Sequence, residues 1–124
     1  MRYWLSSALL IAISLCAGPA PADDGDVARD TQLNRQAQQL SAQGHYADAI
    51  PLLEQSVAIR EKALGSDAPA VAQELNSLAQ AYVDLGRYGE AEPLYRRTLA
   101  IAEKATGTES AAVALYTNNL AVLY

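Results

Sequence analysis

The sequence predicts an all-α fold, a solenoid of stacked helical hairpins (an α-α superhelix) with about two and a half repeats. Alanine and leucine dominate, phenylalanine is absent, and Val, Ile and Thr are sparse, which favours helices over strands. The chain also matches itself at an offset of 42 residues, and apolar residues within each copy recur at three- and four-residue steps. A fixed period in this range is typical of a solenoid, in which each unit completes its neighbour's core.

The first 22 residues are expected to be a secretory signal peptide rather than part of the fold. Arg2 is the only charge before Asp23, an apolar run covers residues 4–18, and residues 20–22 read Ala-Pro-Ala. A positive start, a short apolar core and an Ala-x-Ala site together predict cleavage after Ala22. The run of 15 residues is shorter than the roughly 20 that cross a bilayer. An uncleaved anchor is therefore the weaker alternative, and no membrane association is expected after cleavage.

The rest of the chain has the composition of an acidic protein without disulfides. Residues 23–124 carry 8 Lys and Arg against 14 Asp and Glu, a net charge of −6. Nucleic acid is not an expected partner, because its binding depends on Lys and Arg against phosphate. The one cysteine, Cys16, lies in the predicted leader, so stability must come from packing. Residues 23–30 contain four aspartates and are expected to be a solvated acidic leader.

The 42-residue repeat is the strongest signal in the sequence. Between residues 33–65 and residues 75–107, 15 of the 33 aligned positions are identical. A third copy begins near the end of the chain, where four residues of the second copy recur. These four residues are Asn118, Leu120, Ala121 and Tyr124. The predicted repeats are residues 31–65, residues 73–107 and the partial copy 115–124.

Each repeat is predicted to consist of two helices that end at glycines. In the second repeat, Gly86 and Gly107 mark these ends, because glycine takes the left-handed C-cap conformation without a side-chain clash. The apolar stripes point each helix toward the core. They comprise Leu75, Leu78, Ala79 and Tyr82 on the first helix, and Ala91, Tyr95, Thr98 and Leu99 on the second. The first repeat follows the same plan.

Smaller features refine this arrangement. Alanines on both inner faces are expected to let the helix axes approach closely; they are Ala37, Ala49, Ala79 and Ala91. Ser66-Asp67 and Thr108 to Ser110 are expected to supply N-caps. Pro51 and Pro93 are expected within the first turn of the second helices, where backbone N–H groups have no intrahelical partner to lose.

The second repeat carries a distinctive motif. It reads Leu75-Asn76-x-Leu78-Ala79-x-x-Tyr82, then Gly86-x-Tyr88-x-Glu90-Ala91-Glu92-Pro93. This motif and the 42-residue period resemble the kinesin light chain variety of tetratricopeptide repeat, as reused in exported bacterial proteins, over residues 31–124. The resemblance implies a superhelix whose first helices line a concave groove for peptide segments of partner proteins. The resemblance does not imply a role in motor-cargo binding, because an export signal is foreign to kinesin light chain.

Amide side chains form a second stripe on the first helices, opposite the core. The candidate groove residues are Asn34, Gln38, Gln73, Asn76, Gln80 and Asn118. One Asn or Gln side chain can pair with both the N–H and the C=O of an extended peptide, so a protein or peptide partner is expected. The alternative is that each asparagine bonds to a neighbouring helix and sets the repeat spacing. This alternative is favoured for Asn34 and Asn118, and the two interpretations are balanced for Asn76.

The charge of the groove restricts the partner further. Residues 70–85 include Glu74 and Asp84 but no Lys or Arg. Grooves that hold acidic peptides or C-terminal carboxylates need cations there. We therefore expect this groove to take a neutral or basic segment.

No enzyme signature emerges from the sequence, and neither a metal nor a cofactor is expected. His45, the only histidine, lies in a predicted turn between helices and is expected to be solvated. No cysteine nucleophile remains after residue 22, and no serine has a recognisable base. An open groove of amides also argues against a small-ligand pocket, which is usually closed and apolar.

The end of the sequence leaves two interpretations open. Tyr124 falls inside the first helix of the third copy, so the chain is expected to be a fragment of a longer repeat protein. If it is complete, Leu120, Leu123 and Tyr124 are expected to drive self-association or partner binding. The leading function is an exported protein-interaction module. The alternative is the recruiting N-terminal part of a larger exported enzyme, such as a caspase-like peptidase.

Overall fold

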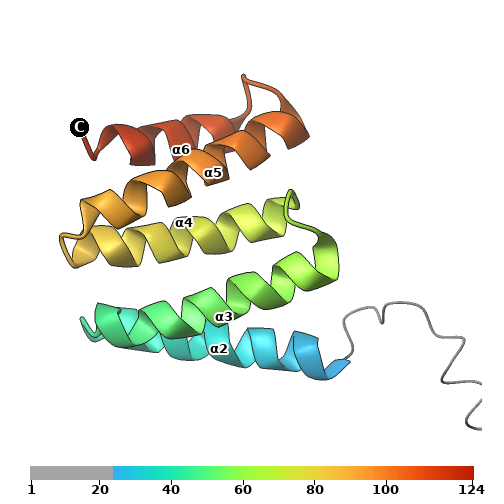
Figure 1. Cartoon of the computed structure of the whole chain (residues 1–124), viewed down its shortest axis with the longest axis vertical. Coiled ribbons are helices and arrows are strands. Elements are labelled where there is room, and N and C mark those ends of the chain that lie inside the picture. The colour runs from blue at the N-terminus through green and yellow to red at the C-terminus, as the bar shows by residue number, and fades with distance from the viewer. Residues whose placement is uncertain (1–23) are drawn as a thin grey trace, which may run out of the picture.

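In the computed structural model, which describes residues 24–124, five helices form antiparallel hairpins that stack in one direction (Figure 1). They are α2 (Asp24–Ala42), α3 (Tyr46–Leu64), α4 (Pro69–Asp84), α5 (Tyr88–Thr106) and α6 (Ala111–Ala121). Each helix packs on the next, and no strand occurs within this range. The predicted all-α hairpin solenoid is confirmed. The predicted signal peptide and its cleavage at Ala22 lie outside the described residues.

The core runs along the stack between the two helices of each hairpin and between hairpins. The four predicted alanines are at most 1% exposed, so the helix axes approach closely at these points. Larger side chains fill the space beside them, led by Leu75 and Tyr95, which are each 1% exposed. Among the described helices, none combines the length and the apolar character that a bilayer-spanning segment needs.

The first helix begins earlier than the sequence suggests. Helix α2 begins at Asp24, so the predicted acidic leader is helical from that residue onward. Aspartates are favoured near a helix N-terminus, where the helix dipole is positive. Asp30 is not solvated either, because its carboxylate lies 3.1 Å from the guanidinium of Arg60. Helix α4 begins at Pro69, close to the residues 70–85 expected for it, since proline at the first helical position loses no hydrogen bond.

The prediction for the two prolines is wrong. Helices α3 and α5 begin at Tyr46 and Tyr88, so Pro51 and Pro93 are the sixth residue of each helix and lie beyond its first turn. Each proline therefore fails to donate to the carbonyl four residues earlier. Both prolines are exposed, so this side of the helix faces solvent, where water can satisfy the released carbonyl.

The N-cap prediction holds for one helix only. The Ser110 hydroxyl accepts a hydrogen bond from the Val113 N–H at 3.2 Å and caps α6. Helix α4 has Ala68 at its N-cap, with no side-chain bond. Asp67 instead forms an ion pair with Lys104 of the next hairpin. The hydrogen bond from Lys104, and then its charge, lower the pKa of the Asp67 carboxyl.

Gly86 ends α4 in the predicted left-handed conformation. Its φ is +77°, the Arg87 N–H donates to the Tyr82 carbonyl at 2.8 Å, and the Gly86 N–H donates to the Val83 carbonyl at 2.8 Å. This is the paired bonding of a Schellman motif, which satisfies carbonyls at the helix end. The turn from α4 into α5 therefore depends on a backbone angle that other residues adopt only at a cost.

Two alanine substitutions in this turn are expected to have opposite effects. Gly86→Ala should lower the free energy of unfolding by about 1 kcal/mol, because a Cβ is disfavoured at positive φ. Gly89→Ala, three residues away inside α5, should raise it by about 0.5 kcal/mol, since alanine is the better helix former and an added Cβ meets no atom within 4 Å. Urea unfolding followed by circular dichroism measures both. Equal effects of the two variants would contradict the role given to Gly86.

Candidate functional site

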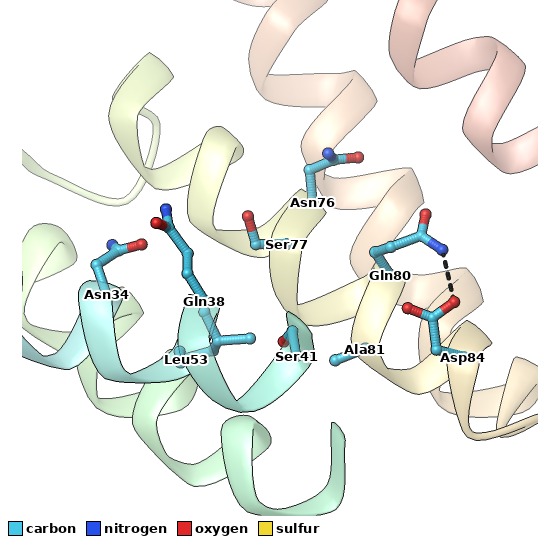
Figure 2. Close-up of a pocket in the computed structure, with 10 residues that line it drawn as sticks. Asn34, Gln38, Ser41, Leu53, Asn76, Ser77, Gln80, Ala81 and Asp84 are labelled. Carbon is cyan, nitrogen blue, oxygen red and sulfur yellow. Dashed lines mark hydrogen bonds between the residues drawn. The ribbon is translucent and has the colours of Figure 1, made fainter. Parts of the chain in front are cut away.

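The candidate site is a furrow between the first helices of the two complete hairpins, called here the α2–α4 furrow. It has a volume of about 310 Å³. Its lining residues are Asn34, Ala37, Gln38 and Ser41 of α2, Leu53 of α3, and Asn76, Ser77, Gln80, Ala81 and Asp84 of α4. Figure 2 shows the polar side chains of α2 and α4 on the two sides of this furrow.

The furrow has an apolar floor and polar walls. Ala37, Leu53 and Ala81 are at most 4% exposed and form part of the hairpin core. The amides of Gln38 and Gln80 are exposed above them. A rigid floor with exposed donors and acceptors at its rim is suited to holding a peptide backbone while leaving its outer side in water.

Gln80 is held in place by a buried tyrosine. The Tyr95 hydroxyl donates to Oε1 of Gln80 at 3.1 Å. Nε2 of Gln80 in turn donates to Oδ1 of Asp84 at 3.1 Å, the bond drawn as a dashed line in Figure 2. Burial raises the pKa of the Tyr95 hydroxyl, and the negative charge of Asp84 raises it further. Tyr95 therefore remains a hydrogen-bond donor, and the chain of bonds fixes the Asp84 carboxylate at one end of the furrow.

The side chains of α2 retain unused hydrogen-bonding capacity. Gln38 forms no side-chain hydrogen bond within the described part of the chain, so its carbonyl and its amide are both available. Asn34 uses its amide to donate to the Ser56 hydroxyl at 3.2 Å, and its carbonyl remains an acceptor. Together they offer donors and acceptors to a ligand in the furrow.

Asn76 is shared between the furrow and the next hairpin. Its carbonyl Oδ1 accepts from Nδ2 of Asn119 at 2.8 Å, which bridges α4 to α6. One repeat earlier, Ser77 stands at the position equivalent to Asn119, and Asn34 stands at the position equivalent to Asn76. The Ser77 hydroxyl instead donates to the Gln73 carbonyl within its own helix at 3.2 Å. The α2–α4 furrow is therefore open where the corresponding α4–α6 position is bridged.

A buried polar cluster lies behind the furrow, at its Asn34 end. Ser56 is fully buried and its hydroxyl contacts the carboxylates of Asp30 and Glu74, the latter at 3.2 Å. Arg60 pairs with both acids, at 3.1 Å to Asp30 and 3.3 Å to Glu74. The cluster joins α2, α3 and α4, and it fixes how the first two hairpins meet.

The second hairpin junction lacks this cluster. Ala72, Thr98, Ala102 and Tyr116 stand at the positions equivalent to Asp30, Ser56, Arg60 and Glu74. They are all buried, and the Thr98 hydroxyl bonds to the Leu94 carbonyl of its own helix at 2.9 Å. The two junctions therefore share one backbone plan, with a polar core at the first and an apolar core at the second.

Comparison with protein families identifies the repeat. A model of the tetratricopeptide repeat matches residues 28–104 and residues 74–124, which together cover most of the chain. This chain belongs to the tetratricopeptide repeat family. No curated protein is similar enough to the chain to count as a match. Tetratricopeptide repeats generally mediate protein–protein interaction.

The tetratricopeptide architecture brings four of the predicted groove residues together. Asn34, Gln38, Asn76 and Gln80 all line the α2–α4 furrow. Gln73 lies in an adjoining depression that shares Asn34 and Gln38. Asn34 and Asn76 also bond to neighbouring helices, as the spacing interpretation expects, so each asparagine has a structural contact and a free polar group.

Asn118 does not join this row. It lines a separate depression on α6 with the preceding loop, residues 108–110. Of the residues expected on the exposed face at the end of the chain, Leu120 and Leu123 are instead partly buried against the core, and Tyr124 is exposed. Self-association through the last helix stays a prediction.

Not every residue of this site follows from the sequence pattern. Ser77 lies outside the strict amide stripe. Asp84, an expected charge of the groove, does line the furrow, and its counterpart in the first repeat is Ala42. Glu74 was expected in the groove, yet it is 5% exposed and belongs to the buried cluster. Arg35 and Arg60, which lie outside the predicted groove, line the adjoining depression.

Proposed function

We propose that this chain is an exported protein-interaction module that binds an extended segment of a partner protein along the α2–α4 furrow. The furrow spans about 10 Å of helix from Asn34 to Ser41 at 1.5 Å per residue. This length corresponds to about three residues of extended chain. The module is proposed to work without catalysis and without a cofactor, as a close relative of the kinesin light chain variety of repeat.

One observation carries the proposal. Gln38 and Asn76 line the same furrow from different helices. The amide NH₂ group of each has no hydrogen-bond partner in the described part of the chain. Fixed donors on a rigid surface hold an extended backbone at little entropic cost. Export is supported by the leader sequence, with its positive start, short apolar core and Ala-x-Ala site.

The experiment is a comparative pull-down with the chain purified from the exported fraction, where an N-terminus at Asp23 is expected. The variant Gln38→Ala, Asn76→Ala removes two free amide NH₂ groups from the furrow, together with the bond from Asn119 to the Asn76 carbonyl. At about 1 kcal/mol for each lost hydrogen bond, its recovery of a specific partner should fall about tenfold or more.

The matched control is Gln39→Ala, Gln43→Ala, which removes two exposed amides of the same hairpin that lie outside the furrow. This control should recover the partner as the unaltered chain does. Equal recovery of every partner by both double variants would eliminate the furrow as the binding site.

A further inference from the structure

Asp84 is the one charged side chain among the residues that line the α2–α4 furrow. It is exposed, yet its carboxylate is held by Gln80, which is itself held by the Tyr95 hydroxyl. Because Tyr95 is 1% exposed, the anchor of this chain of bonds is part of the core. The carboxylate is therefore a fixed feature of the site rather than a mobile surface group.

Asp84 forms no ion pair with another described residue, whereas six other acidic residues of this part of the chain do. The acids in ion pairs within residues 24–124 are Asp30, Glu61, Asp67, Glu74, Glu90 and Glu92. An oriented carboxylate that keeps one oxygen free is a hydrogen-bond acceptor for a cation.

We propose that the segment bound in the α2–α4 furrow carries a lysine or arginine whose side chain sits on Asp84. This inference rests on the proposed function and specifies its partner. The bound backbone meets Gln38 and Asn76, and the basic side chain reaches the free oxygen of Asp84 at the end of the furrow.

An acidic segment is disfavoured in the same place. No Lys or Arg lines the furrow, and the chain as a whole has a net charge of −5. Of the two arginines in the adjoining depression, Arg60 already contacts two carboxylates at 3.1 Å and 3.3 Å, and Arg35 does not line the furrow. A carboxylate that enters the furrow is therefore repelled by Asp84, and no cation that lines the furrow offsets this repulsion.

The test is an array of N-acetylated ten-residue peptides of varied sequence. Each peptide is made in three versions, with lysine, norleucine or glutamate at one position, and is probed with the purified full chain. The lysine versions should bind about fivefold better than the norleucine versions, the ratio that one exposed ion pair supplies. The glutamate versions should bind least, and the differences should shrink as salt is raised.

Three variants complete the experiment. Asp84→Asn keeps the shape of the side chain and should bind the lysine and norleucine versions equally. Glu103→Gln removes the same charge from an exposed site on α5 outside the furrow, and should keep the fivefold preference. Ser77→Asn narrows the furrow and should bind no version well.

Each outcome has a distinct meaning. A lysine preference that survives in Asp84→Asn, or a wild-type chain that does not prefer lysine, overturns the inference and leaves the proposed function standing. A parallel set of the same peptides is left unacetylated. Binding by these peptides alone would assign the cation to the amino terminus and would overturn its assignment to a side chain. If the wild-type chain binds no peptide, or Ser77→Asn binds all of them equally well, the proposed function fails and the inference fails with it.

Discussion

Replacing Arg60 with alanine is expected to lower the free energy of unfolding by about 3 kcal/mol. The substitution leaves the Asp30 and Glu74 carboxylates beside the Ser56 hydroxyl with no cation between them. Glu74 suffers most, because its side chain is only 6% exposed and water cannot replace the guanidinium. The figure lies at the low end for buried pairs because the Arg60 side chain is 22% exposed. Urea unfolding followed by circular dichroism measures the loss.

A second variant distinguishes the cost of leaving two carboxylates without a cation from the cost of losing the whole cluster. Copying the second junction into the first changes four residues: Asp30→Ala, Ser56→Thr, Arg60→Ala and Glu74→Tyr. Because apolar replacement of a complete buried ion cluster is often neutral, this variant should unfold within about 1 kcal/mol of the wild-type chain. A single Arg60→Ala variant as stable as the wild type would show that the cluster does not couple the two hairpins.

The stacking of hairpins could be predicted because burial leaves a periodic trace in sequence. Tyr95 and Ala79 lie in stripes at three- and four-residue steps, and both are buried as those stripes indicate. The 42-residue offset then repeats the stripes, so each unit implies its neighbour. The first residue of each helix was harder to predict. Pro51 and Pro93 were expected in the first turns of their helices, where proline loses no hydrogen bond. Helices α3 and α5 instead begin five residues before them.

The buried polar cluster could not be predicted in the same way. Asp30, Arg60 and Glu74 come from three helices, and a polar contact between distant segments has no periodic signal. Their only trace is a departure from the repeat, because alanine or tyrosine stands at the equivalent positions of the second junction.

The candidate site was predicted in part. The amide stripe placed Asn34, Gln38, Asn76 and Gln80 on one face, and all four line one furrow, because equivalent positions on parallel helices share a face. It could not show that Asn119, rather than Asn118, bonds to Asn76, nor that Gln80 is tied to Asp84. Those details depend on side-chain directions that the repeat period does not specify.

Replacing Ser77 with asparagine is expected to weaken peptide binding by about tenfold or more. At the next junction, asparagine in the equivalent position bonds to Asn76 across the gap between first helices. Asn34 can accept the same bond, because its amide is already directed to Ser56 and its carbonyl is free. The new side chain would bridge the α2–α4 furrow and occupy the path of the bound segment. Isothermal titration calorimetry with the tightest-binding peptide from the array measures the change.

The affinity ratio between Ser77→Asn and Ser77→Ala tests the furrow most directly, because both variants lose the hydroxyl and only one closes the site. The alanine variant should bind the peptide within about twofold of the wild-type affinity. The asparagine variant should bind it about tenfold or more weakly. Both variants should unfold at the same urea concentration as the wild-type chain. Unchanged affinity in a stably folded Ser77→Asn chain would contradict peptide binding between α2 and α4.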